Sequence, residues 1–99
     1  MKMKMYSIYD RCAAAYMRPF YTQRDDEAIR SFRDLALDAQ HPVGQHPEDY
    51  SLFRIGEFDD NTGSVTGENP ECLTRAHELV VAAREVDGDE LARFDKELN

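Results

Sequence analysis

Cations and aromatic rings alternate along the first 24 residues in a pattern that suits single-stranded nucleic acid. If residues 1–9 and 15–21 form two paired strands, the even-numbered side chains of both share one face. Bases stack on such rings for about 1–3 kcal/mol each, while the cations follow the phosphates. The candidate nucleic-acid-binding residues are those on this face and the arginines at the strand ends: Lys2, Lys4, Tyr6, Arg11, Tyr16, Arg18, Phe20 and Arg24.

The same residue types also suit a surface that binds protein. Aromatic side chains at strand spacing commonly form a core or a dimer interface, and lysines near a chain end keep an edge strand soluble. A chain of 99 residues buries a modest core, so a second copy covering an apolar face would stabilise it. A homodimer is therefore expected alongside, or in place of, a nucleic-acid-binding face.

Two loop histidines raise the question of a metal site. His41 and His46 are five residues apart, with Glu48 and Asp49 beside them, but Cys12 and Cys72 lie too far away in sequence to complete a ligand set. We expect solvent-facing loop residues, free thiols, and no metal or cofactor. The acidic turn at residues 59–63 also fails as a calcium loop, because its twelfth position is Pro70 instead of glutamate.

The motifs of common enzyme classes are missing from the sequence. It contains no nucleophile elbow, phosphate-binding glycine loop or dinucleotide fingerprint. Cys12 with a distant histidine is weak evidence for a nucleophile pair. We therefore expect a protein without enzymatic activity.

Charge is distributed unevenly along the chain. The formal net charge is −8, which opposes non-specific affinity for phosphates. Residues 1–24 nevertheless carry five cations against the single acid Asp10, and the acids are concentrated from Asp25 onward. The acidic remainder would repel DNA but attract a basic protein.

Hydrophobic spacing indicates the elements that position these residues. Strands are expected at residues 1–9, 15–21, 50–58 and 64–66, with a turn at 59–63. One helix should begin after Thr22, whose hydroxyl would cap it with Asp25 three residues on, and end near Asp38. A second helix should begin at Asn69 and Pro70 and end before Gly88.

These elements predict an α+β fold in the order ββαββα, with a four-stranded antiparallel sheet covered by helices on one face. A single domain should span residues 1–88, followed by a tail at residues 89–99 that forms a short helix or frays. The composition, 41% apolar and 32% charged, is typical of a soluble globular protein, and no stretch is apolar enough to span a membrane.

Several segments resemble a known phage protein family. The order MKMKMYSIYD, PFY and EAIRSF at residues 1–32, followed by HPEDYSLF and IGEFDD at residues 46–60, is similar to the small nonstructural protein of gokushoviruses, a branch of the single-stranded DNA phages. The resemblance covers roughly residues 1–62, and the segments after about Gly67 lie outside it.

The resemblance implies a role in the switch from double-stranded replicative synthesis to single-stranded genome synthesis. It implies a nonstructural protein in the host cytoplasm, absent from the virion, that binds single-stranded DNA or a viral or host replication protein. The alternative is an acidic homodimeric module that engages a replication protein without binding DNA. No functional residues are carried over from the family, so the candidate site depends on the face described above.

Overall fold

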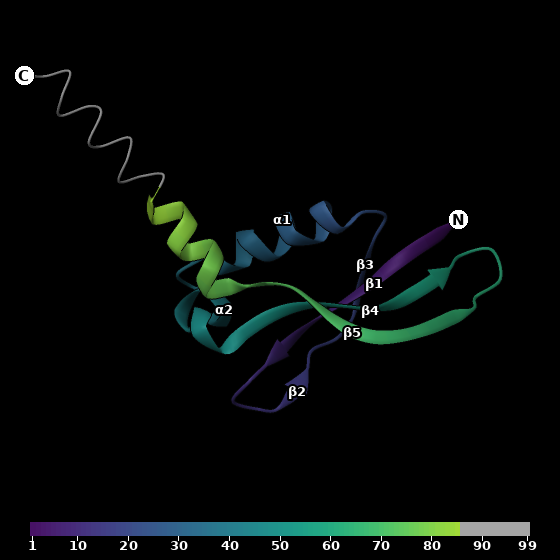
Figure 1. Cartoon of the computed structure of the whole chain (residues 1–99), viewed down its shortest axis with the longest axis horizontal. Coiled ribbons are helices and arrows are strands. Elements are labelled where there is room, and N and C mark those ends of the chain that lie inside the picture. Colours follow the sequence, from purple (N-terminus) through teal and green to yellow (C-terminus); the bar gives the residue numbers. More distant parts are fainter. Residues whose placement is uncertain (86–99) are drawn as a thin grey trace, which may run out of the picture.

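The computed structural model describes residues 1–85, in which five strands form one antiparallel sheet (Figure 1). The strands are β1 (Lys2–Asp10), β2 (Ala15–Tyr16), β3 (Phe20–Thr22), β4 (Tyr50–Asp59) and β5 (Val65–Arg75). Their order is β2–β1–β4–β5, and β3 pairs with β1 beside β2. Strands β1 and β4 are therefore central, while the long strand β5 forms one edge.

Helices cover one face of this sheet. They are α1 (Asp25–Ala36), α2 (Pro42–Gln45), the 3₁₀ turn η1 (Pro47–Asp49) and a helix that starts at residue 76 and continues to the end of the described chain. The sheet contributes Tyr6, Ile8 and Leu52 to the core, and the helical segments contribute the other buried apolar residues, which are Ala28, Phe32, Ala36, Val43 and Ala76. This packing confirms the α+β class and the helices on one face.

The first helix was predicted correctly, but its cap was not. Arg24 occupies the N-cap position in extended backbone without a side-chain hydrogen bond to the helix, and the Thr22 hydroxyl donates to the Arg24 carbonyl oxygen instead. Three acids, Asp25, Asp26 and Glu27, lie in the first turn, where the helix dipole favours negative charge. Charge therefore takes the place of the predicted capping box.

The predicted second strand is two short strands with different registers on β1. Tyr16 pairs with Tyr9 in β2, whereas Phe20 pairs with Tyr6 in β3, so the register changes by one residue between them. Because side chains alternate between faces, a one-residue change places Tyr16 and Phe20 on opposite faces of the sheet. The four-stranded ββαββα order is therefore wrong, and the described sheet has five strands.

The predicted start of the second helix was also wrong. Asn69 and Pro70 were expected to start a helix, but β5 continues through both residues to Arg75. Residues 68–70 lie where the register between β4 and β5 shifts, and β5 is an edge strand. An edge strand tolerates proline at such an irregularity. The predicted helix end at Gly88 and the tail at residues 89–99 lie outside the described residues. No helix within residues 1–85 is long and apolar enough to cross a membrane.

Candidate functional site

Four of the predicted site residues, Lys2, Lys4, Tyr6 and Phe20, lie on the helix-covered face. Tyr6 is fully buried, its hydroxyl donates to Asp25 Oδ1 over 2.7 Å, and Phe20 stacks on its ring at a centroid distance of 5.6 Å. Lys4 extends from the same face to Asp25, 3.5 Å away. Tyr6 therefore presents no ring to a nucleic-acid base, and the predicted common face of alternating rings and cations does not form.

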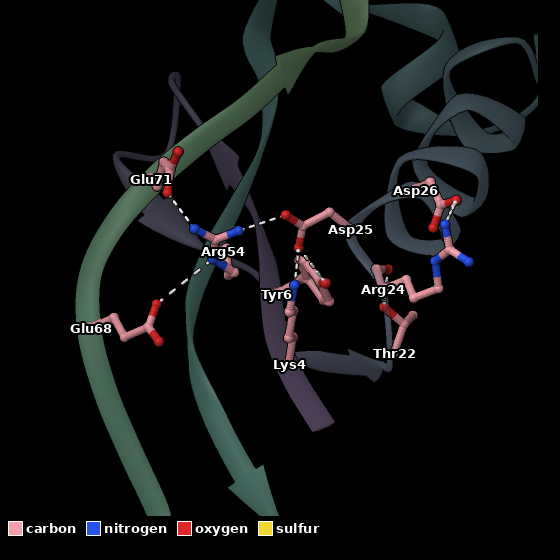
Figure 2. Close-up of polar contacts among 9 residues, drawn as sticks. All are labelled: Lys4, Tyr6, Thr22, Arg24, Asp25, Asp26, Arg54, Glu68 and Glu71. Carbon is pink, nitrogen blue, oxygen red and sulfur yellow. Dashed lines mark hydrogen bonds and ion pairs between the residues drawn. The ribbon is translucent and has the colours of Figure 1, made fainter. Parts of the chain in front are cut away.

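Asp25 and Arg54 organise this part of the molecule, as Figure 2 shows. Arg54 Nη1 lies 2.5 Å from Asp25 Oδ2, and the same guanidinium also contacts Glu71 and Glu68 on β5. Burial raises the pKa of Asp25, but the Tyr6 hydrogen bond and the charges of Arg54 and Lys4 outweigh it and hold that pKa below its usual value. Burial, together with the bond to Asp25, raises the pKa of Tyr6 to about 12.

The remaining predicted cations are dispersed. Arg11 donates to Asp49 over 2.6 Å, and this hydrogen bond lowers the pKa of the Asp49 carboxyl. Arg24 pairs with Asp26 at 3.1 Å. Lys2 lies opposite Asp59 in the β1–β4 ladder, and Arg18 is exposed between β2 and β3. Acidic neighbours thus neutralise much of the basic excess of residues 1–24.

The opposite face of the sheet gathers aromatic rings. Tyr9, Tyr16 and Phe53 form a cluster with centroid distances of 4.9 Å (Tyr9–Tyr16), 5.6 Å (Tyr16–Phe53) and 6.1 Å (Tyr9–Phe53). Tyr21 and Phe58 form a second pair, 5.4 Å apart. Met3 pairs with Phe58 and Met5 with Tyr21 across the ladder, which puts both methionines on this face.

We call this surface the aromatic face, defined by Met3, Met5, Tyr9, Tyr16, Tyr21, Phe53 and Phe58. None of these residues belongs to the core cluster that the described helices form with the sheet. Tyr16 and Tyr21 are 46% and 42% exposed. Of the predicted site residues, only Tyr16 is placed here by its register.

Acids are segregated away from the aromatic face. Four acids of the strands lie on the helix-covered face, where each pairs with a residue of a neighbouring strand. They are Asp10, Glu57, Asp59 and Glu71. On the aromatic side, the paired residues of β5 are Val65, Gly67, Cys72 and Arg75, opposite Phe58, Gly56, Phe53 and Ser51. The strand residues that the described ladders place on the aromatic side therefore include one cation and no carboxylate.

A cavity of about 310 Å³ lies at one end of the aromatic face. Tyr9, Phe53, Ser51 and Cys72 line it together with charged side chains of both signs, which are Arg11, Arg75, Glu48 and Asp49. Both cysteines are free and exposed.

One group of side chains near the cavity has the spacing of metal ligands. One ligand atom each of His46, Glu48 and Asp49 lies within 4.8 Å of the others, but Asp49 Oδ1 already accepts a hydrogen bond from Arg11.

The family assignment follows from similarity of the sequence to known proteins. The model of the Phage ORF5 protein family matches residues 3–79, which include α1 and every described strand except the first residue of β1. The chain belongs to this family. It is also 39% identical over 67 residues to Protein ORF5 of Chlamydia phage 1, a gokushovirus, covering 64% of this chain and 70% of that protein. The resemblance to gokushovirus proteins is thereby confirmed. No solved structure matches the chain.

Sequence reasoning missed most of the aromatic face of this ORF5 family member. Alternation in residues 1–9 correctly separated Met3, Met5 and Tyr9 from Tyr6 and Ile8. Both sets are apolar, however, so the pattern did not indicate which set the helices cover. Phe53 and Phe58 are five residues apart, so alternation would place them on opposite faces; the irregularity at Ile55 in the β1–β4 ladder brings both onto the aromatic face.

Proposed function

We propose that this ORF5 family protein acts in phage DNA replication by binding single-stranded DNA on its aromatic face. The observation that carries the proposal is the group of rings on the central strands β1 and β4 and the short strand β2, on the face away from the described helices. The gokushovirus resemblance implies a role in the switch to single-stranded genome synthesis. The proposed role is non-enzymatic and belongs to the host cytoplasm, outside the virion.

A sheet of this kind is physically suited to unpaired bases. RNA-recognition sheets place aromatic side chains on an open face and stack two or three bases there, which is an analogy of arrangement and not of ancestry. Here the Tyr9–Tyr16–Phe53 cluster and the Tyr21–Phe58 pair supply two stacking positions. Duplex DNA hides the flat surfaces of its bases, so we expect a preference for single strands.

The charge distribution reconciles an acidic protein with a nucleic-acid ligand. Glu68 and Glu71 point to Arg54 on the other side of the sheet, as Figure 2 shows. The cation Arg75 lies on the aromatic side at the β5 edge, and Arg18 is exposed in the loop between β2 and β3, at the opposite edge of the sheet. Bases can therefore approach the aromatic face without meeting strand carboxylates, while phosphates pass near these arginines.

Fluorescence anisotropy with a labelled twelve-residue oligothymidine and a duplex of equal length tests the proposal. We expect binding of the single strand that weakens only modestly as the salt concentration rises, and little binding of the duplex. Tyr16→Ala should weaken binding at least about fivefold, because a stacked base contributes about 1–3 kcal/mol. Leu37→Ala is the matched control, since Leu37, the C-cap residue of α1, is 47% exposed, close to the 46% of Tyr16. Equal affinity of the Tyr16 variant and the wild type would contradict the proposal.

A second candidate function uses the same surface for protein. Lys4, Arg11, Arg24 and Arg54 all have acidic partners, and the aromatic face includes Met3 and Met5, which suit an apolar interface. In this alternative the chain is a homodimeric module that engages a viral or host replication protein. Sedimentation velocity without DNA tests it: a dimer that Tyr16→Ala dissociates, combined with no oligonucleotide binding, favours the module.

A further inference from the structure

The cavity at the end of the aromatic face has a composition that differs from the rest of that face. Its ring walls, Tyr9 and Phe53, belong to the aromatic cluster. Its rim adds the carboxylates Glu48 and Asp49 from η1 and the cations Arg11 and Arg75. The stacking surface therefore continues here into a recess that offers hydrogen-bond donors and acceptors.

Glu48 and Asp49 differ in whether their carboxylates are free to accept a hydrogen bond from a ligand. Asp49 Oδ1 accepts a hydrogen bond from Arg11 over 2.6 Å, and the backbone of Asp49 also accepts one from the Arg11 amide. Glu48 is exposed and forms no ion pair within residues 1–85. Glu48 is consequently the acceptor that the cavity can offer to a ligand, while Asp49 orients Arg11.

A carboxylate in the recess selects against phosphate and for a base edge rich in donors. Guanine presents two adjacent donors, N1–H and the N2 amino group, which match the two oxygens of a carboxylate. It also presents the acceptors O6 and N7, which arginine recognises with two hydrogen bonds. Thymine and cytosine lack this combination, and adenine lacks the paired donors.

We propose that this cavity is a guanine subsite, in which the base stacks on one of the two nearly perpendicular rings, Tyr9 and Phe53, and meets the other at its edge, Glu48 accepts from N1–H and N2, and Arg75 donates toward O6 or N7. The inference rests on the proposed function, since it assigns base selectivity to one end of the same DNA-binding face. The remaining rings bind bases without preference, because every base offers a stacking surface.

Anisotropy with four oligonucleotides tests the subsite: oligothymidine of twelve residues, and the same strand with one central guanine, inosine or adenine. Inosine lacks only the N2 amino group of guanine. We expect the guanine strand to bind at least about fivefold more tightly than the inosine strand, the low end for one specific pair of hydrogen bonds. Glu48→Ala should remove this difference, whereas the control Glu27→Ala, in the exposed first turn of α1, should keep it.

The outcomes separate the subsite from the proposed function. If oligothymidine binds and guanine adds nothing over inosine, the guanine subsite is wrong while single-strand binding stands. If Glu48→Ala tightens all four strands equally, Glu48 acts only by repelling phosphate, and the subsite is again wrong. A wild-type protein that binds none of the strands overturns the proposed function and this inference with it.

Discussion

Asp25 connects the first turn of α1 to both central strands of the sheet. It accepts the Tyr6 hydroxyl from β1, contacts Lys4 on the same strand, and pairs with Arg54 on β4 (Figure 2). Arg54 in turn holds Glu68 and Glu71 of β5. One carboxylate thus fixes α1 to the covered face and, through Arg54, keeps two acids of β5 away from the aromatic face.

Replacing Asp25 should weaken folding in a pH-dependent way. Asp25→Asn removes the charge opposite Arg54 and Lys4, so we expect the free energy of unfolding at pH 7 to fall by about 1–3 kcal/mol. Because the folded pKa of Asp25 is lowered, its contribution is present above the unfolded pKa, near 3.9, and is lost as the pH falls through the folded pKa. Urea unfolding at pH 7 and below pH 3 should therefore show the variant's deficit shrinking in acid.

Asp26→Asn is the matched control for Asp25→Asn. Both acids lie in the first turn of α1, so their contributions from the helix dipole are similar. Within residues 1–85, Asp26 pairs only with Arg24, across a contact in which the side chains are 65% and 72% exposed. Its loss should cost under about 1 kcal/mol. Equal losses for the two variants would mean that the dipole, and not the network around Arg54, stabilises this end of α1.

At the scale of elements, the sequence predicted what depends on local chemistry. The strand at residues 50–58, the turn at residues 59–63 and the body of the first helix are confirmed, because alternation, turn residues and a 3.6-residue stripe are local signals. The start of the second helix was wrong for a non-local reason. Pairing with β4 keeps Asn69 and Pro70 in an edge strand, despite their suitability as a helix start.

The candidate site was harder to predict because it depends on register. Tyr16 and Phe20 have the same parity in sequence, so a continuous strand would place both on one face. The register change between β2 and β3 separates them, and only Tyr16 reaches the aromatic face. Nothing in the local sequence indicates which apolar face of β1 the helices cover, since that choice depends on the packing of α1 against Tyr6 and Ile8.

The close contact between the paired strands β4 and β5 gives a prediction at the scale of elements. Gly56 is buried opposite Gly67, and a Cβ at Gly56 would lie 2.3 Å from the Thr66 carbonyl oxygen. The neighbouring group is backbone, so Gly56→Ala should lower the free energy of unfolding by about 2 kcal/mol or more. A Cβ at Gly67 meets nothing within 4 Å, so Gly67→Ala should be close to neutral. Urea midpoints measure both, and similar losses would contradict this close approach of the strands.

At the scale of the whole molecule, the −8 charge and the proposed ligand are compatible only because the two faces differ. Lys4 and Arg54 form ion pairs with acids of the covered face, and Arg24 pairs with Asp26 at the start of α1. Few cations remain near the aromatic face, so stacking must provide most of the affinity. A protein of this kind should bind single strands with a shallow dependence on salt, unlike basic proteins that track the backbone of a duplex.

The salt dependence of oligothymidine binding measures how many cations contact phosphates. For single strands, each contact contributes about 0.7 to the slope of log K against log salt. If Arg18 and Arg75 each neutralise one phosphate, the double variant Arg18→Gln/Arg75→Gln should make the slope shallower by about 1.4. Arg30→Gln/Arg33→Gln on α1 removes the same charge from exposed positions on the helix side and should leave the slope unchanged. A loss of slope in the α1 variant instead would place the DNA backbone on the helix side and refute the aromatic face as its binding surface.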